Sequence, residues 1–145
     1  MFNKYFVAIL ICLIAFASCK KDSGVSTTPN ITFVSVSSAS IQSLTDSLVF
    51  VIHYEDGDGD LGENNTDVKN LFLIDNRIPI TYSYRIQQLA PDNSTIAIKG
   101  NLNVVLKGIA ITDSSSAQNA TFSIYVKDRA GHQSNTVTSG TVSIH

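Results

Sequence analysis

The sequence lacks tryptophan, has a single methionine at position 1, and contains only two cysteines and three prolines among 145 residues. Charged residues are scarce at 15%, and ten basic against twelve acidic side chains leave a net charge of −2. Nucleic-acid binding requires a basic surface, so this balance argues against a nucleic-acid partner. The length suits one folded domain, which excludes a multidomain enzyme.

β-Branched and hydroxyl side chains are abundant, with 30 serines and threonines and 28 isoleucines and valines. These residue types favour strands over helices. Short apolar segments separated by turn residues predict a single antiparallel β-sandwich, an all-β fold. The predicted strands are Ile31–Ser37, Leu48–Glu55, Lys69–Asp75, Ile78–Ile86, Thr95–Lys99, Leu102–Ile109, Ala120–Asp128 and Thr136–Ile144. The predicted turns and loops are Asn76–Arg77, Ala90–Ser94, Gly100–Asn101 and Asp113–Asn119.

Two of these segments alternate between apolar and polar residues, as half-buried strands do. One apolar face consists of Ile78, Ile80, Tyr82, Tyr84 and Ile86, and the other of Ala120, Phe122, Ile124 and Val126. We expect the core of the domain to contain Phe50, Ile52, Phe122, Ile124 and Val126.

The amino terminus has the pattern of a secretory signal. Lys4 precedes the apolar run Phe6–Ala17, which is too short to span a bilayer but suits a signal peptide. Small residues end this run directly before Cys19, and the polar stretch from Lys20 to Asn30 follows. Because Cys12 lies inside the run, its removal leaves Cys19 as the only thiol, unable to form an internal disulfide.

This junction resembles the signal of bacterial lipoproteins, particularly those of the Bacteroidota, although Phe16 stands where an aliphatic residue is usual. The resemblance implies a lipid-modified Cys19, an outer-membrane location and attachment to the membrane through that lipid. The implied organisation is a signal peptide at 1–18, a flexible tether at 19–30 and the β-sandwich at 31–145. A cleaved secretory signal and an uncleaved anchor are the alternatives.

The stretch from Tyr125 to Asn135 resembles the last hairpin of bacterial immunoglobulin-like domains, in which a strand ends in Asp and turns through Ala-Gly. The resemblance implies an immunoglobulin-like sandwich. Asp128 has two interpretations: a cap that accepts backbone N–H groups of the turn, which we favour, or a metal ligand.

Half of the carboxylates lie in one short window. Residues 55–67 contain six of the twelve, and neither lysine nor arginine accompanies them. The window contains Glu55, Asp56, Asp58, Asp60, Glu63 and Asp67. Adjacent negative charges raise one another's pKa values, and a bound cation removes that cost. Glycines between the aspartates allow successive carboxylates to converge.

The segment Asp56–Gly62 resembles the calcium loops of EF-hands, dockerins and thrombospondin-type repeats. The three aspartates then occupy ligand positions one, three and five, with the Gly62 carbonyl at seven and Asp67 at twelve. Leu61 replaces the usual glycine, and a strand precedes the loop, so the segment is not an EF-hand. We predict one structural Ca²⁺ bound by Asp56, Asp58 and Asp60, with the Gly62 carbonyl, Asp67 and Glu63 completing its shell. The alternative is a solvated acidic turn.

The same glycines match the dinucleotide fingerprint GxGxxG, but Asp58 and Asp60 would repel a pyrophosphate, so we expect no nucleotide ligand. Sequence motifs for catalysis are also missing: His53, His132 and His145 have no metal-ligand spacing, and there is no GxSxG elbow. We therefore expect a non-catalytic protein.

Two functions from different classes fit these features. The first is a lipid-anchored binding or adhesion module of the cell envelope, in which Tyr82, Tyr84 or Tyr125 contacts a glycan or an envelope protein. The second is a structural subunit of a larger export, uptake or surface assembly. A groove of exposed aromatics favours the first, and a flat apolar patch or a bare edge strand favours the second.

Overall fold

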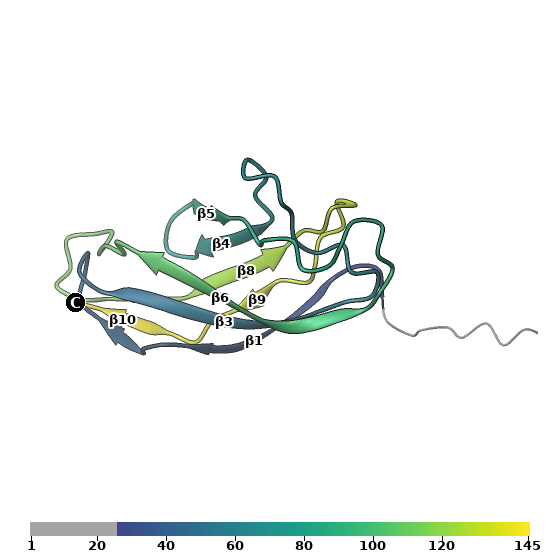
Figure 1. Cartoon of the computed structure of the whole chain (residues 1–145). Helices are drawn as coiled ribbons and strands as arrows, with labels where there is room; N and C mark the ends of the chain where they lie inside the picture. The colour runs from purple at the N-terminus through teal and green to yellow at the C-terminus, as the bar shows by residue number, and fades with distance from the viewer. Residues whose placement is uncertain (1–25) are drawn as a thin grey trace, which may run out of the picture.

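The structure, a computed structural model, describes residues 26–145 (Figure 1). Cys19 and the predicted signal peptide lie outside the described residues. Within them the chain forms ten β-strands and no α-helix. The strands are β1 (Asn30–Val36), β2 (Ser40–Ile41), β3 (Ser47–Asp56), β4 (Leu71–Asp75), β5 (Ile80–Tyr84), β6 (Ile98–Lys107), β7 (Gln118–Ala120), β8 (Phe122–Val126), β9 (Val137–Thr138) and β10 (Val142–Ile144).

The strands form three sheets, with the orders β1-β3-β6, β5-β4-β8-β9 and β2-β10-β7. All pairings are antiparallel except that of β2 with β10. Because Thr121 alone separates β7 from β8, the short third sheet continues the four-stranded one. The two layers pack face to face, which confirms the prediction of an all-β sandwich.

The core lies between the layers and contains most of the residues that alternation predicts, but Ile80, on the predicted apolar face of 78–86, is exposed. Phe50 on β3 meets Phe122 on β8 edge to face, with ring centroids 5.1 Å apart. Each belongs to a different layer, so this contact crosses the sandwich. The predicted core residues Phe50, Ile52, Phe122, Ile124 and Val126 are all fully buried, and this prediction is confirmed.

The predicted turn at Gly100–Asn101 is wrong, because both residues lie inside the continuous strand β6. Gly100 pairs with Tyr54 on β3, and a Cβ at Gly100 would stand 3.0 Å from the Tyr54 hydroxyl oxygen. The glycine therefore provides space for the Tyr54 ring on the neighbouring strand. Glycine inside a strand often marks such a close approach, but from the sequence alone it resembles a turn residue.

Three short elements also differ from the prediction. β2 was not expected, and β7 begins inside the predicted loop 113–119. The predicted strand 136–144 is divided into β9 and β10 at Ser139, whose hydroxyl accepts the N–H of Phe122 at 3.0 Å and donates to the Gly140 carbonyl. A side chain that bonds the backbone in this way competes with regular strand pairing.

The acidic loop and the first described residues lie at the same end of the sandwich. β3 ends at Asp56, and its partner β1 begins at Asn30, opposite Glu55. The chain contacts the domain from Ser26 onward, before the predicted boundary at Ile31, and Pro29 is buried. Within residues 26–145 no helix has the length and apolar character needed to cross a membrane.

Candidate metal centre

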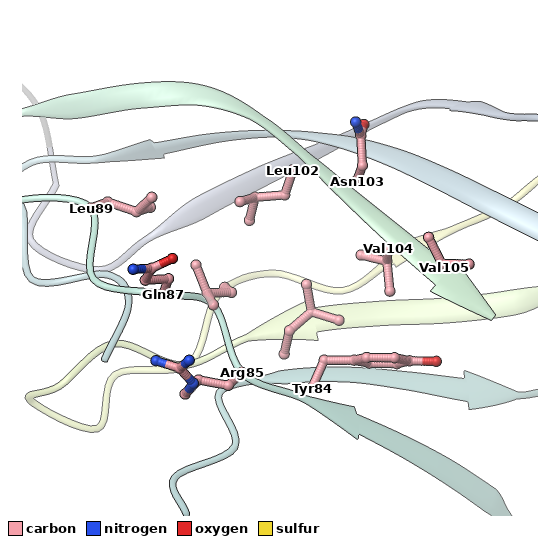
Figure 2. A pocket seen from close by; sticks show the side chains of 10 residues that line it. Tyr84, Arg85, Gln87, Leu89, Leu102, Asn103, Val104 and Val105 are labelled. Atoms are coloured by element: carbon pink, nitrogen blue, oxygen red, sulfur yellow. The ribbon is translucent and has the colours of Figure 1, made fainter. Parts of the chain in front are cut away.

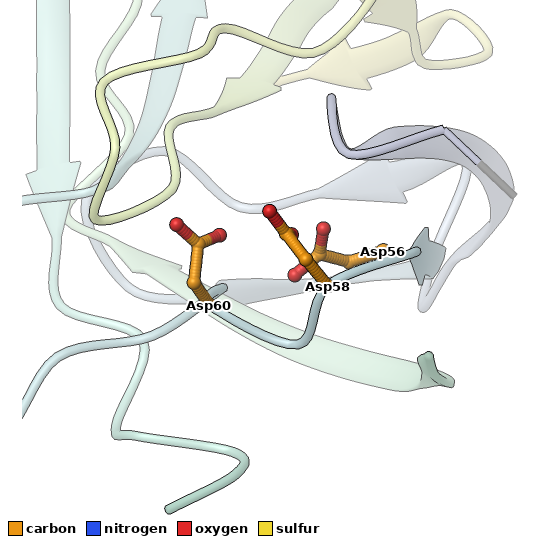
Figure 3. A group of neighbouring side chains, drawn as sticks. All are labelled: Asp56, Asp58 and Asp60. Carbon is orange, nitrogen blue, oxygen red and sulfur yellow. The ribbon is translucent and has the colours of Figure 1, made fainter. Parts of the chain in front are cut away.

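Asp56, Asp58 and Asp60 form a cluster of carboxylates directly after β3 (Figure 3). Asp56 is the last residue of the strand and is fully buried, whereas Asp58 and Asp60 are half-buried in the loop. One carboxylate oxygen from each side chain lies within 4.8 Å of the other two. The fold therefore brings together the three aspartates that the sequence predicts as metal ligands.

Two glycines with left-handed backbone conformations shape this loop. Gly59 has φ +75°, and a Cβ there would stand 2.4 Å from the Ile96 carbonyl oxygen. Gly62 has φ +93°, and a Cβ there would meet the Gln87 carbonyl oxygen at the same distance. Both positions combine a conformation that favours glycine with backbone packed too closely for any side chain. The loop consequently lies tightly against the segment between β5 and β6.

Each aspartate has one buried oxygen without a hydrogen-bond partner. Within residues 26–145, four buried side-chain polar atoms have no partner, and three of them are the Oδ1 atoms of Asp56, Asp58 and Asp60. The Oδ2 atoms of Asp56 and Asp60 accept the N–H groups of Leu61, at 2.8 Å, and Ala130, at 3.1 Å. Burial of a charged oxygen without a donor costs several kcal/mol. A set of three such oxygens fits a hard cation, which would satisfy all of them at once.

The electrostatics of the cluster oppose ionisation of its carboxyl groups. Burial is the largest cause that raises the pKa of Asp56 to about 6, and the charges of Asp58 and Asp60 raise it further. The hydrogen bond from the Leu61 N–H stabilises the ionised form and lowers the pKa in part. The pKa of Asp60 is also raised, first by burial and then by Asp128 and Asp58. A bound cation would reverse these shifts because it favours the ionised form.

A turn that follows β8 holds the acidic loop from the other layer. The Arg129 N–H donates to the Asp60 carbonyl at 3.2 Å, and the Arg129 guanidinium donates to the Gly62 carbonyl at 2.8 Å. The predicted ligand atom of Gly62 therefore has an arginine as its partner. Sequence analysis missed this arginine because it is 67 positions from Gly62; the Asp-Arg-Ala-Gly motif was the signal available.

Asp128 caps this turn, as the favoured interpretation predicts. The backbone N–H that it accepts belongs to His132, at the end of the turn. The Asp128 carboxylate accepts the His132 N–H at 2.7 Å and faces the His132 Nδ1 at 2.9 Å. The hydrogen bond to Asp128 and the charge of that carboxylate raise the pKa of the His132 imidazole. Asp128 thus has partners for both of its oxygens, in contrast to the three aspartates of the loop.

Glu63 and Asp67, the remaining predicted ligands, are not part of the three-aspartate group. The Glu63 carboxylate accepts the Asn65 N–H at 2.9 Å, and the backbone N–H of the exposed Asp67 donates to the Asn65 side-chain oxygen at 3.0 Å. The likeness to a calcium loop therefore extends to the aspartates at ligand positions one, three and five, and the chain diverges afterwards.

A second concave feature lies between β6 and the segment that follows β5 (Figure 2). The cavity has a volume of about 430 Å³, and Arg85 is the only charged residue in its lining. Leu102 and Val104 point into it from β6 toward Tyr84 and Gln87, whereas Asn103 points away (Figure 2). The lining residues are Leu71, Tyr84, Arg85, Ile86, Gln87, Leu89, Leu102, Asn103, Val104 and Val105.

The tyrosines that the sequence offers as ligand contacts lie on different surfaces. Tyr84 is half-buried and lines the cavity, and Tyr82 shares its face of β5 and packs against the core. Tyr125 lies on the opposite face of the sheet and stacks on Phe72, with ring centroids 4.8 Å apart. The structure therefore does not gather the three tyrosines into one aromatic groove.

The three histidines have separate partners. His53 lies on β3 and bonds the Asn101 side chain, His132 bonds Asp128, and His145 bonds the Ser40 hydroxyl. Searches of family models, of curated proteins and of solved structures find no match for this chain.

Proposed function

We propose that this protein is a non-catalytic binding or adhesion module of the cell envelope, anchored by a lipid on Cys19 and stabilised by one Ca²⁺ at Asp56, Asp58 and Asp60. The observation that carries the proposal is the set of three buried carboxylate oxygens without donors, within 4.8 Å of one another. A cation bound by these oxygens would offset the repulsion among the carboxylates.

Calcium suits this cluster better than the other common divalent ions. The donors are oxygens only, which disfavours zinc, since zinc prefers nitrogen and sulfur ligands. Magnesium requires near-ideal octahedral geometry, whereas calcium accepts irregular shells of six to eight oxygens. Three carboxylates from one short loop leave the other coordination positions to water, a composition common at calcium sites of modest affinity.

Thermal unfolding of the purified protein tests the calcium site. If Kd is about 10⁻⁴ M, 10 mM Ca²⁺ adds roughly 2.7 kcal/mol to the free energy of unfolding, and Tm rises accordingly. Asp58→Asn should lose most of this rise. Asp67→Asn removes the same charge outside the cluster and should keep it. Equal Tm values for the parent in calcium and in chelator would contradict the proposed site.

The lipid anchor rests on Cys19 and the small residues before it. A protein with two or more acyl chains binds membranes stably, whereas one chain gives marginal binding. We expect the parent to partition into the detergent phase and Cys19→Ala to move to the aqueous phase. Equal partition of both proteins, with equal processed mass, would contradict lipidation. Lys20 follows Cys19 where an acidic residue would favour retention at the inner membrane, and this residue supports an outer-membrane location.

The structural-subunit alternative is favoured by one specific feature, the bare edge of β6. This ten-residue strand pairs only with β3 among the described strands, and the apolar cavity lies beside its other edge. An exposed edge next to an apolar groove accepts an added strand from a partner. A photocrosslinker at Leu89, an exposed residue of the cavity lining, distinguishes the two functions in intact cells: a discrete adduct supports the subunit, and glycan binding without an adduct supports the module.

A further inference from the structure

The first described residues are attached to the loop that carries the three aspartates. The carbonyl of Ser26 accepts the N–H of Gly57 at 2.9 Å, and Gly57 lies between Asp56 and Asp58. Figure 3 shows this purple amino-terminal segment beside the two aspartates. Pro29 is buried, and Ser26 also accepts the Thr28 N–H on its hydroxyl at 3.0 Å. The segment therefore lies on the domain at the candidate metal centre.

The start of β1 is bonded to the segment that follows the turn after β8, at the same end of the sandwich. The Asn135 side chain accepts the Ile31 N–H and donates to the Ile31 carbonyl, each at 2.8 Å. Asn135 follows the Asp128–His132 turn, whose Ala130 N–H bonds Asp60. The amino-terminal segment is thus held on one side by the acidic loop and on the other by the segment that contacts Asp60.

We propose that the ion at Asp56, Asp58 and Asp60 controls the attachment of residues 26–30 to the domain. This inference rests on the proposed calcium site and adds a regulatory consequence to it. Without a cation, repulsion among the buried carboxylates lowers the free energy needed to open the loop locally, which releases the Gly57 N–H from Ser26. With calcium bound, the ligands on both sides of Gly57 are crosslinked, and the junction remains closed.

The consequence concerns the distance between the domain and the membrane. Residue 26 is seven positions from Cys19, so a closed junction leaves only this short stretch between the domain and the proposed lipid. An open junction would add residues 26–30 to the predicted tether and increase its reach, because extended chain spans about 3.3–3.6 Å per residue. Calcium would therefore hold the domain close to the membrane, and its removal would allow the domain to extend farther from it.

A single tryptophan reporter tests the junction, since the natural chain contains none. Thr27→Trp places the indole at an exposed residue of the segment, and Ser114→Trp places it at an exposed residue of the loop before β7 as a matched control. Both reporters are made in the full-length chain. We expect calcium to raise the fluorescence anisotropy at position 27, to leave position 114 unchanged, and to have no effect at position 27 when Asp58→Asn is added.

The outcomes separate the two proposals because Tm is measured on the same samples. A calcium-dependent rise in Tm without a change in anisotropy at position 27 would overturn the junction and leave the calcium site standing. A protein whose Tm does not respond to calcium would overturn the calcium site itself. An equal rise in anisotropy at positions 27 and 114 would indicate a general change in tumbling and would also overturn the junction.

Discussion

The two ends of the sandwich each bury an aspartate at the end of a strand, and they compensate its charge differently. Asp56 ends β3 and is fully buried, and Asp75 ends β4 with 1% of its surface exposed. The strand β8 relates the two ends, because it begins opposite Asp75 and leads into the turn that bonds Asp60.

At the Asp75 end the chain supplies its own cation. The Arg77 guanidinium donates to Asp75 Oδ1 at 3.0 Å and to Asp75 Oδ2 at 2.7 Å, and the Arg77 N–H adds a third bond. The rest of the guanidinium donates to the Ala110 carbonyl and the Gln118 side chain. Both charged groups are therefore buried with their hydrogen-bonding capacity used, the condition under which a buried ion pair is tolerated.

At the Asp56 end, Arg129 bonds a backbone carbonyl and none of the three carboxylates. Arg129 donates its guanidinium to the Gly62 carbonyl, and the Oδ1 atoms of the three aspartates have no donor. An internal cation stabilises the fold under all conditions, whereas an external cation makes stability depend on its concentration. The comparison indicates that a residue of the chain compensates Asp75, whereas the proposed calcium ion would compensate the three aspartates at the other end.

The largest expected effect is at the Asp75 end. Arg77→Met keeps the length of the side chain but leaves Asp75 as a buried charge without its cation, which should cost about 3–5 kcal/mol. The loss should be the same in calcium and in chelator, as measured by urea unfolding. Lys107→Met, which removes an exposed cation, should change stability little. If calcium restored the stability of Arg77→Met, the proposed difference between the two ends would be wrong.

A smaller effect, with a change of sign, is expected at the Asp56 end. Asp58→Asn removes one of three crowded charges, so without metal the variant should be more stable than the parent, by about 1 kcal/mol. In 10 mM Ca²⁺ the order should reverse, because the variant has lost a ligand. Melting curves of both proteins in the two buffers measure this crossing. A variant that is less stable than the parent in both buffers would contradict the repulsion between the aspartates.

The smallest effect is a dependence on pH in metal-free buffer. Because the pKa of Asp56 is raised to about 6 in the folded state, against about 4 when unfolded, only the folded protein binds this proton between those values. Stability should therefore decrease as pH rises through this window, with a drop of a few degrees in Tm. Calcium competes with the proton, so its contribution to Tm should be larger at pH 7.5 than at pH 5.

One variant isolates the contribution of Asp56 to this pH dependence. The His132 imidazole, whose pKa is also raised, acts in the same direction, because a raised pKa means that the folded state binds the proton more tightly. Asp60, whose pKa is raised as well, contributes in the same direction, so Asp56→Asn should reduce the pH dependence below pH 6 and leave the parts due to Asp60 and His132. An unchanged profile in Asp56→Asn would assign the whole dependence to other groups.

Alternation along the chain was sufficient to predict a sandwich and five residues of its core. Phe122, Ile124 and Val126 are apolar at every second position, and a strand with that pattern has one buried face in any sandwich. Short elements were less predictable. β2 and β10 contribute two and three residues, and their parallel pairing depends on which strands meet in the fold, so no local pattern indicates it.

Only part of the candidate site could be predicted from the sequence. The spacing of Asp56, Asp58 and Asp60 with intervening glycines indicated convergent carboxylates, because it is a property of five consecutive residues. The fates of Gly62, Glu63 and Asp67 were not predictable. Counting positions along a calcium loop assumes a helix-associated backbone, and here Gly62 packs against Gln87 and has its carbonyl bonded by Arg129.

The sequence by itself determined the strand faces, the composition of the core and the concentration of negative charge after β3, because each depends on residues that are neighbours along the chain. Only the tertiary structure decided which charges are compensated. The Arg77 side chain reaches Asp75 two positions away, but its burial needs Ala110 and Gln118 from other segments. Arg129 comes to Gly62 rather than to the orphaned oxygens of the aspartates because the packing of the β8 turn directs it there.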